Sequence, residues 1–244
     1  ILLSGAITHA ATVQSGGTQI VNAGADDIAA TVLSGGVLVY QGGSLSLLVL
    51  SAGATEVVAA GYTYGGVEVS SGVTLLVSGA VDSNTVSQGG LEIIAAGGTA
   101  SVTTVSGTET VLGKDIAGII LNQQIVSSGG VTSAVVVSSG GTQTVLTGGT
   151  ASGTRISSGG LELVSSGGLA TATVISGGGR QTLAAGGSAS GTIVSSGGTQ
   201  TLLSGGSASG TVVSSGGQLL NSGGFESATS LTAGATETIV AGGS

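Results

Sequence analysis

The sequence predicts an all-β protein, a right-handed parallel β-helix with three sides and about 13 rungs of 18–20 residues. Three observations predict this fold class: glycine pairs recur at a fixed spacing, short apolar segments separate them, and large side chains are scarce. The chain has 244 residues, of which 50 are Gly, with 2% aromatic residues and no Pro, Cys, Met or Trp. Such a chain cannot fill a globular core, yet its 40% hydrophobic content is too high for disorder.

The glycine pairs mark two turns in each repeat. In the C-terminal half, one series advances by 19 residues and begins at Gly140, Gly159, Gly178, Gly197 and Gly216. A second series keeps the same step and begins at Gly129, Gly148, Gly167, Gly186 and Gly205. The N-terminal half keeps both series with some drift in spacing. Because Gly adopts positive φ without a Cβ clash, these positions are predicted corners.

The segments between the corners have the length of strands and are too short for helices. Strand alternation predicts which columns face inward when the rungs stack about 4.8 Å apart. One predicted interior column contains Val137, Ile156, Ile175, Val194, Val213 and Leu231. A second one contains Val135, Thr154, Thr173, Thr192, Thr211 and Thr229, and the column between them, which includes Arg155, is predicted to face outward. A further interior column, after the first turn, contains Val145, Val164, Leu183, Leu202 and Ile239.

One column of Gln and Glu residues conflicts with simple alternation. It contains Gln19, Glu56, Glu92, Glu109, Gln124, Gln143, Glu162, Gln181, Gln200 and Glu237. Alternation would bury these groups, and an unpaired buried carboxylate is costly. Either the turn backbone satisfies them at the rim of the rung, or a bulge turns them outward; the rim is favoured. Gln and Glu alternate without rule, which favours a structural role over a catalytic one.

The repeats extend along the whole chain, so we expect residues 1–244 to form a single solenoid. Residues 107–121 are predicted to form an irregular, shortened rung and the site of a kink or bulge. The chain begins inside a repeat and ends at a turn, which is expected of a fragment of a longer protein.

The charge excludes several function classes. The net charge is −8, and Lys114, Arg155 and Arg180 are the only basic side chains, so we expect no nucleic-acid partner. Enzymes built on β-helices need carboxylates clustered with Lys or Arg, which the repeats do not provide. We therefore expect no enzymatic activity, no catalytic residue, no cofactor and no metal. No apolar run is long enough for a membrane helix.

The remaining polar and aromatic residues have ordinary interpretations. The acidic pair Asp26–Asp27 is predicted to lie in a solvated loop, and His9 is predicted to be structural or exposed. Tyr40, Tyr62 and Tyr64 are close in sequence and could stack on sugars, but packing or surface roles are favoured.

The repeat unit Gly-Gly-Thr-Ala-Ser-Gly-Thr-x-x-Ser-Ser-Gly-Gly-x-Gln/Glu-x-Val/Leu is clearest at 148–160, 186–200 and 205–217. It resembles the AIDA-type repeat of self-associating autotransporter adhesins. The resemblance implies a three-sided β-helical passenger domain at the surface of a Gram-negative bacterium or secreted from it. It also implies a membrane-spanning barrel that is not part of this stretch. The outer faces here are mostly Ser, Thr, Ala and Gly, which argues against self-association through salt bridges.

The function that the resemblance implies is adhesion or scaffolding through self-association, cell aggregation or biofilm formation. Candidate partners are a second copy, host or surface glycans or proteins, and a glycosyltransferase, because some members of the family are glycosylated. The candidate glycan acceptors are Ser157, Ser158, Ser214 and Ser215, although turn formation alone accounts for these serines. The alternatives are a filament subunit and, less favoured, a glycan-binding or ice-binding solenoid. Interrupted Thr-x-Thr columns argue against ice binding.

Overall fold

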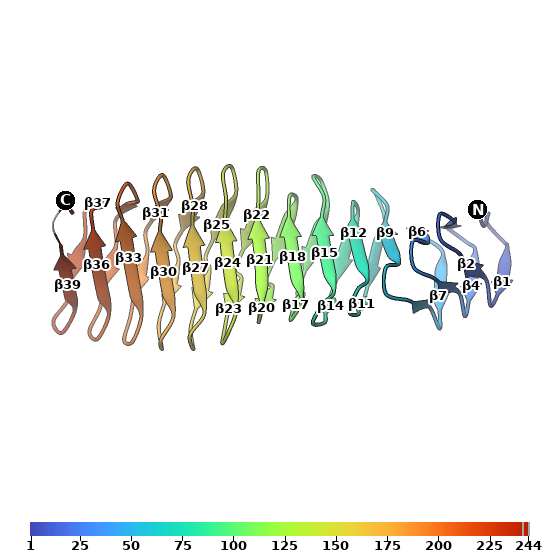
Figure 1. Ribbon diagram of the computed structural model, residues 1–244, viewed down its shortest axis with the longest axis horizontal. Coiled ribbons are helices and arrows are strands. Elements are labelled where there is room, and N and C mark those ends of the chain that lie inside the picture. Colours follow the sequence, from blue (N-terminus) through green and yellow to red (C-terminus); the bar gives the residue numbers. More distant parts are fainter. Residues whose placement is uncertain (241, 244) are drawn as a thin grey trace.

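The computed structural model describes residues 1–240 and 242–243, and all regular structure in these residues is β-strand. The rungs stack along one long axis, with the two termini at opposite ends of the rod (Figure 1). Each rung contributes a strand to each of three faces, and every pair of neighbouring strands is parallel. The predicted parallel β-solenoid is therefore confirmed.

The first face is one unbroken sheet of 13 strands, which we call the main sheet. Its strands are β3 (Thr18–Asn22), β6 (Val37–Gln41), β9 (Thr55–Val58), β12 (Thr74–Val77), β15 (Leu91–Ile94), β18 (Thr108–Val111), β21 (Gln123–Val126), β24 (Thr142–Val145), β27 (Leu161–Val164), β30 (Arg180–Leu183), β33 (Thr199–Leu203), β36 (Gln218–Ser222) and β39 (Thr236–Ile239).

The second face is divided into sheets of three and ten strands. The three-stranded sheet contains β1 (Ile7–His9), β4 (Asp26–Ile28) and β7 (Ser44–Ser46). The ten-stranded sheet contains β10 (Thr63–Gly65), β13 (Ala80–Asp82), β16 (Thr99–Ser101), β19 (Lys114–Ile116), β22 (Val131–Ser133), β25 (Thr150–Ser152), β28 (Leu169–Thr171), β31 (Ser188–Ser190), β34 (Ser207–Ser209) and β37 (Phe225–Ser227).

The third face is divided at the same rung. Its first part contains β2 (Thr12–Val13), β5 (Thr31–Val32) and β8 (Val49–Leu50). Its second part contains β11 (Glu68–Val69), β14 (Thr85–Val86), β17 (Thr104–Val105), β20 (Ile119–Ile120), β23 (Val136–Val137), β26 (Arg155–Ile156), β29 (Val174–Ile175), β32 (Ile193–Val194), β35 (Val212–Val213) and β38 (Ser230–Leu231).

Glycine turns close the rungs. In the turn Ser214–Gly217, the Gly217 N–H donates to the Ser214 carbonyl (2.8 Å) and Gly216 has φ +74°, as a type II turn requires. The second glycine of such a turn lies against the rung below. A Cβ at Gly141 would lie 2.1 Å from the carbonyl oxygen of Ile120. Glycine is therefore needed both for turn geometry and for close stacking.

The core is a narrow stack of aliphatic columns along the axis. Val137, Ile156, Ile175 and Val194 are buried one above the other, as predicted, and Arg155 between two such columns is exposed. Val145, Val164, Leu183 and Leu202 form the predicted column on the main sheet. The β-branched and leucine side chains pack in register, so each rung completes the core of its neighbours.

The strand pairing of the structure is interrupted at one place. Neither β7 nor β8 pairs with β10 or β11, so strand pairing joins the third rung to the fourth only in the main sheet. A further hydrogen bond joins their turns, from the Gly53 N–H to the Gly72 carbonyl (2.7 Å). Through the short rung, by contrast, pairing continues on all three faces, and Gln124 lies above Glu109 after only 15 residues. None of the described residues forms a helix that could cross a membrane.

Candidate functional site

The candidate acceptor serines lie at the corners between the third face and the main sheet. Ser158 and Ser215 are exposed, and Ser157 and Ser214 are partly exposed. The carbonyl groups of Ser157 and Ser214 close their turns by accepting from Gly160 (2.9 Å) and Gly217 (2.8 Å). Backbone hydrogen bonds therefore close these turns without using the serine hydroxyls.

The outer side of the main sheet is a long, nearly uncharged surface. Its central column has aliphatic side chains in the first five rungs, Ile20, Val39, Val57, Leu76 and Ile93, all partly exposed. From β18 onward the column consists of Thr residues, such as Thr144, Thr182 and Thr201, interspersed with Ile and Leu. This arrangement suits repeated weak contacts with a flat partner surface.

The three basic residues do not form a cluster. Arg180 lies on the main sheet, Lys114 on the second face and Arg155 on the third, and all three are exposed. No group of three or more His, Asp or Glu side chains in the described part of the chain could hold a metal ion. His9 is exposed at the end of β1.

Two sequence interpretations need correction at the N-terminal end and in the Gln/Glu column. Asp26–Asp27 does not form a solvated loop: both residues belong to β4, and Asp27 is buried and accepts a hydrogen bond from Thr8 (2.7 Å). The Gln and Glu column does not lie at the rim either. From Gln19 to Gln200 its members are buried inside the solenoid, and we call this the polar column.

Hydrogen bonds between successive rungs explain how the polar column is tolerated. Gln143 donates to Gln124 Oε1 (2.7 Å) and Gln200 donates to Gln181 Oε1 (2.7 Å). Threonines of the opposite wall also donate to Gln143, Gln181 and Gln200. Thr154 donates to Gln143 (3.0 Å) and Thr211 donates to Gln200 (3.1 Å). Strand alternation indicates correctly that these side chains face inward. The sequence alone favours the rim because it does not show that stacked amides and threonines satisfy one another's hydrogen bonds.

Three buried acids lie together around the short rung. Gln124 donates to Glu109 and to Asp115 Oδ2 (2.7 Å), while Asn84 donates to Glu92 Oε1 (3.2 Å). The other oxygens, Glu92 Oε2, Glu109 Oε1 and Asp115 Oδ1, have no partner. Burial raises the pKa of Glu92 to about 7 and that of Asp115 to about 6, and it raises the pKa of Glu109 well above its usual value. Protonation therefore relieves the cost of burying these acids.

Comparisons with known proteins agree with this architecture. A family model described as the adhesin of the bacterial autotransporter system, probable stalk, matches residues 126–179 and 166–217. A solved structure, that of a TibA fragment whose hyperglycosylation is catalysed by TibC, superimposes on this chain with a TM-score of 0.82. It is 30% identical, and the match covers 98% of this chain and 98% of that chain. The chain belongs to the AIDA family of autotransporter adhesins. The resemblance inferred from the repeats is thus confirmed, and no curated protein sequence matches the chain.

The family model and the TibA structure match different lengths of the chain. The glycine pairs and the columns from β21 to β36 include the region that the family model matches. The similarity to TibA extends over nearly the whole chain, so the N-terminal rungs share the same architecture.

Proposed function

We propose that this chain is a rigid stalk segment of a surface-displayed adhesin and that it mediates self-association through the outer side of its main sheet. The observation that supports the proposal is the unbroken sheet of 13 strands with repeated, uncharged side chains on its outer side. Arg180 is the one charged residue that the described strands of this sheet place outward. Two copies can therefore approach without repulsion along this face.

Avidity gives such a surface its strength. Each rung adds one weak contact of Thr, Val, Ile or Leu side chains, and the rigid rod presents all of them at once. Contacts of this kind bury apolar area and need no buried ion pair. We infer that the protein acts without catalysis and at the outside of a Gram-negative cell, in accordance with its adhesin family.

Bead aggregation tests the proposal. The purified chain, coupled to beads, should aggregate them, and the double variant Thr144→Lys, Leu163→Lys should abolish aggregation by placing like charges on the proposed face. Ile193→Lys is the matched control, because Ile193 is exposed on the third face. Equal loss in both variants would contradict the role of the main sheet, and fibres growing from the control without bead aggregation would favour a filament subunit.

We also propose that turn serines accept glycans. The TibA fragment that this chain resembles is hyperglycosylated by TibC. The hydroxyls of Ser157, Ser158, Ser214 and Ser215 make no hydrogen bond within the described residues. The intact mass of protein made in the native host should exceed that of the bare sequence. The quadruple Ser→Ala variant should lose part of this excess, and a mass equal to the bare sequence would refute the proposal.

A further inference from the structure

A cleft opens in the wall of the solenoid between its third and fourth rungs. On two of the three faces the strands on either side of it, β7 and β8 before and β10 and β11 after, do not pair with each other. The main sheet continues behind the cleft through β6, β9 and β12. The cleft is therefore a lateral opening whose floor is the inner side of the main sheet.

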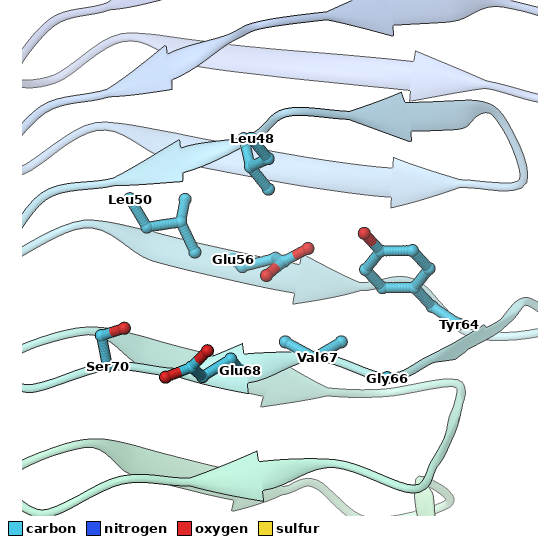
Figure 2. Close-up of a pocket in the computed structure, with 8 residues that line it drawn as sticks. All are labelled: Leu48, Leu50, Glu56, Tyr64, Gly66, Val67, Glu68 and Ser70. Atoms are coloured by element: carbon cyan, nitrogen blue, oxygen red, sulfur yellow. The ribbon is translucent and has the colours of Figure 1, made fainter.

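The opening holds a cavity of about 240 Å³. Leu48 and Leu50 line one side, Val67 and Tyr64 line the other, and Glu56 on β9 lies between them (Figure 2). Glu68 and Ser70 stand at the exposed rim. The ring of Tyr64 is held by stacking on Tyr40, with ring centroids 4.5 Å apart. The cavity thus has aliphatic and aromatic walls and a carboxyl group at its base.

Glu56 differs from the other acids of the polar column. Its partners in register are Leu38 on β6 and Leu75 on β12, so no amide stands above or below it. Its side chain is 1% exposed and its Oε1 has no hydrogen-bond partner. A leucine at position 56 would continue the aliphatic stack that Leu38 and Leu75 form on either side of it. Glu56 therefore carries the one inward carboxyl group of β6, β9 and β12; it lines the cavity, and its buried Oε1 has no partner in the described chain.

The groups around the cavity define the chemistry of a ligand. Glu56 and Glu68 are acceptors when ionised, and no basic residue lines the cavity. An anion would be repelled. A ligand that satisfies Glu56 must donate hydrogen bonds, carry positive charge and cover Leu48, Leu50 and Val67 with apolar atoms. An ammonium group on an aliphatic chain has all three properties, and a neutral sugar lacks the charge and the apolar chain.

We propose that this cleft binds a primary alkylammonium group, with the ammonium on Glu56 and the aliphatic chain between the leucines and Val67. The Tyr64 hydroxyl lies in the same cavity and remains protonated at neutral pH, because burial raises its pKa to about 12. It can accept a second ammonium hydrogen. The site uses no outward residue of the main sheet, so it is independent of the surface proposed for self-association.

Proton linkage gives the site a characteristic signature. Burial raises the pKa of Glu56 to about 7, and the titratable groups that face it are Tyr64, Tyr40 and, at the rim, Glu68. The ammonium binds the ionised form of Glu56. Affinity should therefore rise about tenfold per pH unit below pH 7 and level off above it, and binding below pH 7 should release a proton.

Calorimetric titration of the whole chain with n-pentylamine tests the proposal, with 1-pentanol and glucose as neutral comparisons. We expect binding of the amine, no binding of the two neutral probes, and affinity at least about tenfold lower in Glu56→Gln. Glu92→Gln is the matched control, because it changes an equally buried acid of the same column away from the cleft. It should bind like the unchanged chain.

Three outcomes would overturn the proposal. They are equal binding by Glu56→Gln, loss of binding in Glu92→Gln as well, and tighter binding of glucose than of the amine. Circular dichroism and thermal melting of each variant establish that it is folded, and Glu56→Gln should melt no lower than the unchanged chain because it removes an unpaired buried carboxyl. Bead aggregation, which tests the main-sheet surface, should be the same for Glu56→Gln and the unchanged chain.

Discussion

The polar column has a different composition and a different hydrogen-bonding pattern in the first four rungs and in the rungs from β21 to β33. In the first four, polar residues alternate with leucine, Gln19 below Leu38 and Glu56 below Leu75, and Gln19 Oε1 and Glu56 Oε1 have no partner. From β21 to β33 every rung carries a polar residue in this column, and these residues hydrogen-bond in two runs, Gln143 to Gln124 and Gln200 to Gln181 to Glu162. A buried amide is thus stable in a solenoid when its neighbouring rungs are also polar.

The largest expected effect comes from interrupting the series. Gln181→Leu removes the donor to Glu162 (2.6 Å) and the acceptor of Thr192 (3.3 Å) and Gln200 (2.7 Å). Thr192 and Gln200 are left without this acceptor, and Glu162 keeps the hydrogen bond from Thr173 (3.1 Å). The free energy of unfolding should therefore fall by about 4 kcal/mol, measured by urea unfolding. Gln19→Leu, beside Leu38, is the control and should change it by less than about 1 kcal/mol. Equal losses would mean that the context of the column does not matter.

Equivalent turn glycines should differ between the two regions. At Gly141 a Cβ would overlap the Ile120 carbonyl of the rung below, so Gly141→Ala should lower the free energy of unfolding by about 3 kcal/mol. At Gly17, on the first rung, the nearest atom is the Gln14 carbonyl oxygen at 3.0 Å. Gly17→Ala should cost less than about 1 kcal/mol. If the two variants have the same midpoint in urea, rung stacking does not require glycine.

The acids between the two regions should make stability depend on pH. Because the folded pKa of Glu92 is about 7 and that of Asp115 about 6, both above the unfolded value near 4, their contribution is complete below pH 4. It is lost as pH rises toward 7, by about 1.4 kcal/mol per pH unit for each group. Urea unfolding at pH 4 to 8 measures this slope. Glu92→Gln should flatten it and the exposed Glu68→Gln should not; a stability that rises with pH would be contrary to the prediction.

The smallest effect is expected on the outside of the rod. Ser209 donates to Ser190 across 3.4 Å on the second face, where water competes for the same groups. Ser209→Ala should change the free energy of unfolding by less than about 0.5 kcal/mol. A loss comparable to that of Gln181→Leu would show that outer hydroxyl contacts matter as much as the interior series.

Much of this fold follows from local rules that the sequence displays. Glycine spacing predicted the corners, and strand alternation predicted that Val137 and Thr154 point inward while Arg155 points outward. The position of the Gln and Glu residues was not predicted correctly, because their partners lie on the next rung and on the opposite wall. The cleft was not predicted either, since glycine spacing is regular there. Its sequence signal is Leu47–Leu48, where Leu47 takes φ +55° and is 76% exposed.

The direction of the interior hydrogen bonds has an electrostatic consequence. Each glutamine in the series donates to the rung that precedes it, from Gln200 to Gln181 and from Gln143 to Gln124, so the amide dipoles point the same way and add. Each run ends, on its positive side, at a carboxyl group, Glu162 in one case and Glu109 in the other. The side chains thus reproduce inside a β-structure what an α-helix achieves with its backbone, an axial field with an acid at its N-terminal end. The interior of the rod is therefore electrically polar along these two runs.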